Sequence, residues 1–178
     1  MRFRKAAPDD LTAVVSFYGD VSDAMIGTAF DCQWRRGKHP TEAQIADAIA
    51  AQTLTIADDG GAIAAAVIVN HDYDVSTDPE MPWSVDCAQD EAVIIHVLAV
   101  SPAYRGGGVA RELLSHVLDE ARAAGMRSVR LGAALSNTPA VRLYERSGFQ
   151  RVIVAEKMFG DVKVDAVVFE LPLQTDRT

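Results

Sequence analysis

The stretch from Val93 to Val152 decides the fold: VIIHVLAVSPAYRGGGVARELLSHVLDEARAAGMRSVRLGAALSNTPAVRLYERSGFQRV. An apolar run stops at Pro102, and the chain then passes through consecutive glycines at Gly106–Gly108 into a helical pattern. A glycine-rich bend between a strand and a helix directs several backbone N–H groups to one point, where the helix dipole favours an anion. The stretch therefore predicts a phosphate-binding bend.

The patterns on both sides of the bend predict a parallel strand–helix–strand unit. Ala92–Val100 is a nearly continuous apolar strand, which is typical of a sheet interior. Apolar residues then recur at helical spacing over 109–121, and Gly125 is typical of the left-handed residue that follows a helix. Ser128–Leu131 is the next strand, so the helical crossover makes the two strands parallel.

The remaining segments predict antiparallel strands on both sides of this unit. Pro8–Asp10 and Thr41–Gln44 are typical of helix N-termini, and the regions 27–40 and 72–90 are predicted to be loops. We expect an α+β fold whose central mixed sheet contains the parallel crossover and is flanked by helices. The other strands expected are Met1–Ala6, a hairpin of Thr53–Ala57 with Ala62–Asn70, and a hairpin of Val152–Phe159 with Val162–Leu171 around Gly160-Asp161.

Two common nucleotide-binding motifs do not fit the bend. A dinucleotide fingerprint has G-x-G-x-x-G, but Arg111 stands where the third glycine is needed. A P-loop ends in Gly-Lys-Ser/Thr, which the bend lacks. The remaining pattern is R-x-x-G-x-A, formed by Arg105, Gly108 and Ala110.

This pattern resembles the signature of the GCN5-related N-acetyltransferase (GNAT) superfamily. The resemblance includes the preceding Val100-Ser101-Pro102 step and continues through Asn137, Ala140, Tyr144 and Gly148-Phe149. It implies a GNAT-like acyl-CoA N-acyltransferase fold with acetyl-CoA as co-substrate and direct transfer in a ternary complex. It further implies one N-acetyltransferase domain over 1–178, with the coenzyme-binding segment at 93–152.

The resemblance also assigns residues to the coenzyme. Amides from the bend would surround the pyrophosphate, and a bulge near the end of the Ala92–Val100 strand would free backbone groups for the pantetheine arm. The amide of Leu98 would lie near the thioester carbonyl. The coenzyme-binding residues implied are Leu98, Ala99, Val100, Arg105, Gly106, Gly107, Gly108, Val109, Ala110, Arg111, Asn137 and Tyr144.

Two catalytic residues are predicted, each with a structural alternative. His96 is the strongly polar residue of its strand and is a candidate base for the amine, or else a core histidine with a neighbouring partner. Tyr144 matches the family tyrosine that protonates the coenzyme sulfur, or else it is an aromatic packed on the sheet. Asn137 is either a contact of the coenzyme arm or a helix cap.

Composition limits the class of partner. The formal net charge is −8 with a sequence pI near 4.9, which argues against nucleic-acid binding and is compatible with a cationic amine. Cys32 and Cys87 lie far apart, so neither a disulfide framework nor a metal site is expected. Without an apolar stretch that could span a bilayer or act as a leader, the expected location is the cytoplasm, away from membranes.

The predicted function is acetyl transfer to a primary amine of a small molecule. The acceptor site is expected in the two loops, which carry Trp34, Tyr73 and Trp83 among several aspartates. The alternatives are a protein or peptide N-acetyltransferase and a non-catalytic acyl-CoA-binding regulatory module. The family resemblance also allows a homodimer through the C-terminal strands.

Overall fold

The computed structural model describes residues 1–74, 77–156 and 164–173. Within these residues, seven strands form one mixed sheet in the order β1 (Arg2–Lys5), β2 (Leu54–Asp59), β3 (Ala62–Asn70), β4 (Ala92–Val100), β5 (Ser128–Ala134), β7 (Ala166–Pro172) and β6 (Gln150–Ala155), which confirms the expected fold class. The chain divides into two compact units, one of Met1–Val69 with His96–His116 and the other of Asn70–Ile95 with Val117–Thr178. The strand β4 (Ala92–Val100) contributes residues to both units, and its bounds are those expected from the apolar run.

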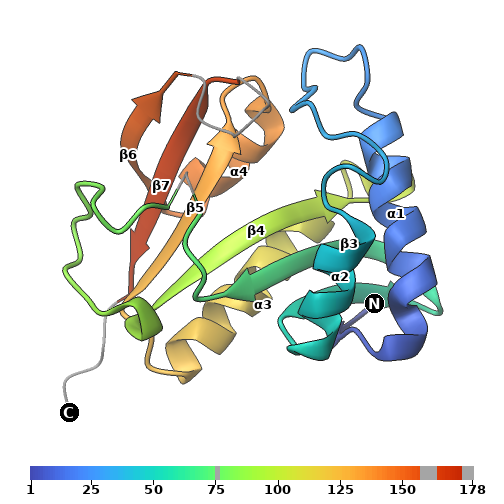
Figure 1. Cartoon of the computed structure of the whole chain (residues 1–178), viewed down its shortest axis with the longest axis horizontal. Helices are drawn as coiled ribbons and strands as arrows, with labels where there is room; N and C mark the ends of the chain where they lie inside the picture. The colour runs from blue at the N-terminus through green and yellow to red at the C-terminus, as the bar shows by residue number, and fades with distance from the viewer. Residues whose placement is uncertain (75–76, 157–163, 174–178) are drawn as a thin grey trace. The chain divides into compact units, whose positions relative to one another are not determined.

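In the first unit, β1, β2 and β3 pair antiparallel in chain order, as predicted (Figure 1). The β2–β3 turn consists of Gly60 and Gly61, whose φ values of 68° and 96° give the two positive angles that a tight hairpin turn requires. The predicted capping box of Thr41 and Gln44 is also confirmed at the start of α2. The elements are β1 (Arg2–Lys5), the 3₁₀ turn Pro8–Asp10, α1 (Leu11–Asp23), α2 (Glu42–Ala50), β2 (Leu54–Asp59) and β3 (Ala62–Asn70).

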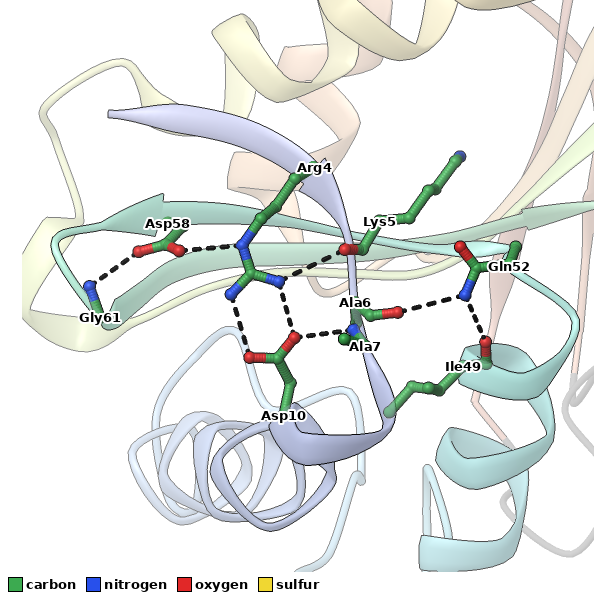
Figure 2. A network of polar contacts seen from close by, with 9 residues as sticks. All are labelled: Arg4, Lys5, Ala6, Ala7, Asp10, Ile49, Gln52, Asp58 and Gly61. Carbon is green, nitrogen blue, oxygen red and sulfur yellow. Dashed lines mark hydrogen bonds and ion pairs between the residues drawn. The ribbon is translucent and has the colours of Figure 1, made fainter.

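A polar network around Arg4 holds β1 to the start of α1 and to the β2–β3 hairpin (Figure 2). The Arg4 guanidinium donates to both carboxylate oxygens of Asp10, at 2.6 and 3.0 Å, and to Asp58 at 2.9 Å. Asp10 also accepts a hydrogen bond from the Ala7 amide, and Asp58 accepts one from the Gly61 amide. The hydrogen bond from Arg4 is the main reason why the pKa of Asp10 is lowered.

The second unit contains the parallel pair and a C-terminal antiparallel part. Residues 92–94 of β4 pair in parallel with 128–130 of β5, which confirms the predicted crossover through α3 (Val109–Ala123). β7 lies between β5 and β6 and pairs antiparallel with both. The predicted turn Gly160-Asp161 lies outside the described residues. The elements are β5 (Ser128–Ala134), α4 (Thr138–Arg146), β6 (Gln150–Ala155) and β7 (Ala166–Pro172).

A buried ion pair that the sequence analysis did not find lies in the core of this unit. Arg130 on β5 and Glu170 on β7 are 2% and 1% exposed, and the Arg130 Nε donates to Glu170 at 3.2 Å. Ser128 and both the amide and hydroxyl of Ser84 also donate to the Glu170 carboxylate. Burial alone would raise the pKa of Glu170, but these hydrogen bonds and the Arg130 charge outweigh it, so the pKa is lowered.

Arg130 also fixes the long loop that precedes β4. Its guanidinium donates to the Tyr73 hydroxyl and to the Val85 carbonyl, each at 2.7 Å. Its Cζ lies 4.3 Å from the centroid of the Trp83 ring, which is a cation–π contact. The Arg130 guanidinium therefore fixes the described part of the 72–90 loop through its contacts with Tyr73, Trp83 and Val85.

We predict that Glu170→Gln destabilises the protein by about 3–5 kcal/mol at neutral pH, because it leaves the Arg130 charge buried without a counter-charge. Since the folded-state pKa of Glu170 is lowered, the stabilisation is present above the ordinary glutamate pKa of about 4.3 and is lost as the pH falls through the folded-state value. Urea denaturation at a series of pH values measures both effects. The exposed pair of Glu145 with Arg151 supplies the control, because Glu145→Gln should change stability by less than about 1 kcal/mol.

Candidate active site

The glycine bend lies between the 3₁₀ turn Pro102–Tyr104 and the first residue of α3. Gly106 and Gly108 have φ values of 79° and 86°, in the region that side chains with a Cβ rarely adopt. An ideal Cβ built at either position would meet nothing within 4 Å. These glycines are therefore required by the backbone conformation, and the space beside them is open.

Several backbone N–H groups at this bend have no acceptor among the described residues. The Arg111 amide donates to the Gly108 carbonyl at 3.0 Å, and the Gly107 amide approaches the Tyr104 carbonyl at 3.4 Å. Within the described residues, no acceptor is found for the amides of Gly106, Gly108, Val109 and Ala110. The start of α3 thus offers several hydrogen-bond donors at the positive end of the helix dipole.

Tyr104 anchors the bend to the β2–β3 hairpin. Its hydroxyl donates to the Asp59 carboxylate at 3.0 Å, and this hydrogen bond raises the pKa of Tyr104. The amide of Ser101 donates to the Ala64 carbonyl at 2.9 Å, which ties the end of β4 to β3. Tyr104 could not be predicted from the sequence, because a tyrosine beside a glycine bend has no distinctive pattern.

Near its end, β4 has an unusual backbone conformation. Val97 has a φ of 45°, a left-handed conformation that is a genuine outlier for a β-branched residue. Such a residue costs of order 1–3 kcal/mol and persists only where the surroundings impose it. The carbonyl of Val97 accepts a hydrogen bond from the Tyr18 hydroxyl at 3.0 Å. The irregularity directly precedes Leu98, Ala99 and Val100, the predicted contacts of the pantetheine arm, and directly follows His96, which is half-buried.

The predicted residues Asn137 and Tyr144 belong to the second unit, whereas the other predicted site residues belong to the first. Asn137 is the N-cap of α4, and its side chain accepts a long hydrogen bond of 3.4 Å from the Ala140 amide. Tyr144 is 5% exposed and packs against Phe149 and Phe169, with ring centroids 5.6 and 5.8 Å away. Burial raises the pKa of Tyr144, so its hydroxyl carries a proton at neutral pH.

The chain matches a protein-family model. It is the model of the acetyltransferase (GNAT) family, and it matches residues 23–149. The chain belongs to the GNAT family. Similar curated proteins include a ribosomal protein bS18-alanine N-acetyltransferase of Escherichia coli, 34% identical over 86 residues that cover 47% of this chain and 57% of the relative. A mycothiol acetyltransferase of Streptosporangium roseum is 46% identical over 57 residues, which cover 32% of this chain and 17% of the relative.

Solved structures extend the similarity of fold to nearly the whole chain. A GNAT-family acetyltransferase of Streptococcus agalactiae superposes with a TM-score of 0.78 at 18% identity, covering 97% of this chain and 95% of that one. The acetyltransferase yncA of Salmonella typhimurium, solved with its cofactor acetyl-CoA, has a TM-score of 0.71 at 23% identity, covering 98% and 94%. At these identities the superposition shows the GNAT fold. The chain spans just over half the length, 57%, of the first curated relatives that it matches.

The glycine bend at Gly106–Gly108 has a geometry that fits a coenzyme phosphate. The open space at Gly106 and Gly108 lets an anion approach the amide donors without a Cβ in between. Arg105 and Arg111 are exposed beside these donors, and no carboxylate partner is found for either within the described residues. Amides and cations together are the ligands that a pyrophosphate requires.

The aromatic residues predicted for the acceptor have other contacts. Tyr73 and Trp83 lie against Arg130, so their faces meet a cation of the chain itself. Trp34 lies edge-on to Tyr18 and to His39, with ring centroids 6.4 and 5.5 Å away. Tyr73 and Trp83 are therefore used in contacts within the fold, and the amine site that the sequence predicts from the three rings stays a prediction.

The described residues contain no group of three or more His, Cys, Asp or Glu that could hold a metal ion. None of the helices found among those residues combines the length and the apolar character that crossing a bilayer requires.

We predict that Gly108→Ala weakens binding of coenzyme A at least tenfold, because the left-handed backbone is strained and a methyl group enters the space before the amides. Isothermal titration calorimetry measures the dissociation constant. Gly125→Ala is the matched control, since Gly125 has a φ of 73°, also has open space around it, and follows the opposite end of α3. Equal losses of affinity in both variants would contradict the assignment of the bend.

Proposed function

We propose that the chain transfers an acetyl group from acetyl-CoA to a primary amine, by direct attack in a ternary complex. The observation that carries this proposal is the open set of amide donors at Gly106 and Gly108–Ala110, in a chain that belongs to the GNAT family. The proposal treats 1–178 as one N-acetyltransferase domain with its coenzyme-binding segment at 93–152.

In this proposal the coenzyme is held mainly by backbone. The amides of the bend bind the pyrophosphate, with Gly107 and Val109 part of the same turn, and Arg105 and Arg111 add charge. The backbone groups of Leu98, Ala99 and Val100 align the pantetheine arm in the manner of an added strand. Asn137 provides a further contact to that arm in addition to capping α4.

Acetyl transfer needs a neutral amine, a stabilised oxyanion and a protonated leaving group. His96 takes the proton that the amine loses, and the Leu98 amide donates to the oxygen of the acetyl carbonyl as negative charge develops there. Tyr144 gives its phenolic proton to the thiolate. One C–N bond forms and one C–S bond breaks, so the products are the acetylated amine and free coenzyme A. Solvent exchange then returns Tyr144 to the phenol and His96 to the neutral base.

The acceptor that we propose first is a small molecule with a primary amine. The formal net charge of −8 favours an approaching cation over an anion. On α1 and in the 27–40 loop, the carboxylates of Asp20, Asp23 and Asp31 are paired with arginines, so the net acidity, and not these groups, carries the attraction.

A protein N-terminus is the second candidate acceptor. It is favoured by the similarity to the bS18-alanine N-acetyltransferase of Escherichia coli, which is 34% identical over 86 residues. The two candidates share the chemistry at the acetyl group and differ only in what surrounds the amine.

The proposal is tested by incubating the protein with acetyl-CoA and a library of polyamines, amino acids, arylalkylamines and peptides with free N-termini. Thiol release and product masses are measured together. We expect release that depends on one class of acceptor. Binding of acetyl-CoA without release for any amine would favour a regulatory module, and a product found only with peptides would replace the small-molecule acceptor.

We predict that Tyr144→Phe lowers kcat by about 100-fold or more, because the thiolate then leaves without a general acid. The ring contacts with Phe149 and Phe169 remain, so the thermal midpoint should change little. Steady-state kinetics with the best acceptor measure the effect. An unchanged kcat would remove the acid role.

We expect His96→Ala to lower kcat/KM at neutral pH and to recover at high pH, where the free amine loses its proton without help. The pH dependence of kcat/KM between neutral and alkaline pH is the measurement. A constant ratio of variant to wild type across this range would indicate that His96 has a structural role instead.

A further inference from the structure

The backbone outlier at Val97 lies at the point where the acetyl group would be held. Its φ of 45° is found inside a strand whose neighbouring residues are otherwise extended. A left-handed residue in a strand turns the following peptide group out of the regular ladder. The group turned in this way is the peptide that joins Val97 to Leu98, whose N–H is the proposed donor to the acetyl carbonyl.

The structure shows one side chain that bonds to this peptide. Tyr18 on α1 is 2% exposed, and its hydroxyl donates to the Val97 carbonyl at 3.0 Å. Burial raises the pKa of Tyr18, so the hydroxyl keeps its proton and acts as a donor at neutral pH.

The planarity of the peptide bond connects the two ends of this group. In a trans peptide the carbonyl and the N–H lie in one plane and point in opposite directions. A hydrogen bond to the Val97 oxygen therefore fixes the direction of the Leu98 N–H. It also polarises the peptide, which makes the N–H a stronger donor.

Tyr18 itself is held by its surroundings. Its ring lies edge-on to Phe17 at 5.1 Å and to Trp34 at 6.4 Å between centroids. The next residue is Gly19, where a Cβ would overlap the guanidinium of Arg36, and Arg36 in turn pairs with Asp20 and Asp23. The 27–40 loop is thus packed onto α1 at Tyr18, through Trp34, and over the following turn, through Arg36.

We propose that Tyr18 is a positioning residue for acetyl transfer, acting through the Val97–Leu98 peptide to orient and strengthen the amide that binds the acetyl oxygen. The inference rests on the proposed function and adds a residue that acts without contacting the substrate. Because an oxyanion forms only as the amine attacks, Tyr18 contributes to kcat and not to coenzyme affinity.

The first test uses no substrate. The backbone ¹H–¹⁵N spectrum of ¹⁵N-labelled Tyr18→Phe is compared with that of the wild-type protein. We expect the Leu98 amide proton to move upfield and the coupling constant that reports the Val97 φ to move towards an extended value. Unchanged Leu98 and Val97 signals would overturn the proposal, whatever the activity of the protein.

The second test is steady-state kinetics of the same variant with acetyl-CoA and the best acceptor. We expect kcat to fall about tenfold, less than the 100-fold or more for direct loss of an oxyanion donor, with KM for acetyl-CoA changed less than about twofold. Thr55→Val is the matched control, because it removes a buried hydroxyl from β2 that is bonded to Lys5. It should lower the thermal midpoint without lowering kcat.

The outcomes separate the two proposals. A fall in kcat for Tyr18→Phe but not for Thr55→Val supports the positioning role. Equal falls in both variants, or a shifted Leu98 amide with unchanged kcat, overturn it. Absence of turnover by the wild-type protein with every acceptor overturns the proposed function and the catalytic role together, while the amide signals still decide whether Tyr18 holds the peptide.

Discussion

The open amide donors at the start of α3 are the feature on which the rest of the site depends. They lie beside Gly106 and Gly108, which take positive φ values, and like the first N–H groups of any helix they have no acceptor within α3. The direction of such backbone N–H groups is set by the backbone conformation and not by side-chain rotamers. Their geometry is therefore as rigid as the elements on both sides, and the Tyr104–Asp59 hydrogen bond holds the bend to the neighbouring hairpin.

Charge reinforces this arrangement in an acidic protein. Arg4, Arg36 and Arg130 each pair with carboxylates, and their charges are used within the fold. Arg105 and Arg111 have no such partner within the described residues. The positive potential at the bend is thus free to act on an anionic ligand, although the chain as a whole repels one.

The parts of the structure that the sequence predicts are those with local signals. The bounds of β4 follow from an apolar run, the cap of α2 from Thr41 and Gln44, and the bend from its glycines. The insertion of β7 between β5 and β6 could not be predicted, because strand order depends on long-range pairing. The Arg130–Glu170 pair joins residues 40 positions apart, and although both stand in apolar strands, nothing in the sequence shows that the two side chains meet.

Some residues of the candidate site can be predicted from the sequence and others cannot, again because only local patterns carry a signal. Residues of the bend have a motif, whereas the left-handed Val97 has none, since a β-branched residue in an apolar run predicts a regular strand. The aromatic residues of the Asp72–Asp90 loop predict an amine site. The contacts of Tyr73 and Trp83 with Arg130 could not be predicted, because Arg130 lies on β5, far from both residues in the sequence.

The side chains that hold the 27–40 and 72–90 loops are different from the backbone groups that we propose to bind the coenzyme. In the proposed mechanism, binding of the coenzyme depends on backbone groups at 98–111, which tolerate little change in conformation. The loops that the sequence predicts for the acceptor are held by side chains outside residues 98–111, the 27–40 loop by Arg36 and Trp34 and the 72–90 loop by Arg130. Since neither loop supplies these backbone groups, substitutions in the loops can change the predicted surroundings of the amine without changing the groups that we propose to act on the acetyl group. Tyr18 contacts both the Val97 carbonyl and the ring of Trp34, so in its proposed role a change in the 27–40 loop that moves Trp34 also acts on the Val97–Leu98 peptide.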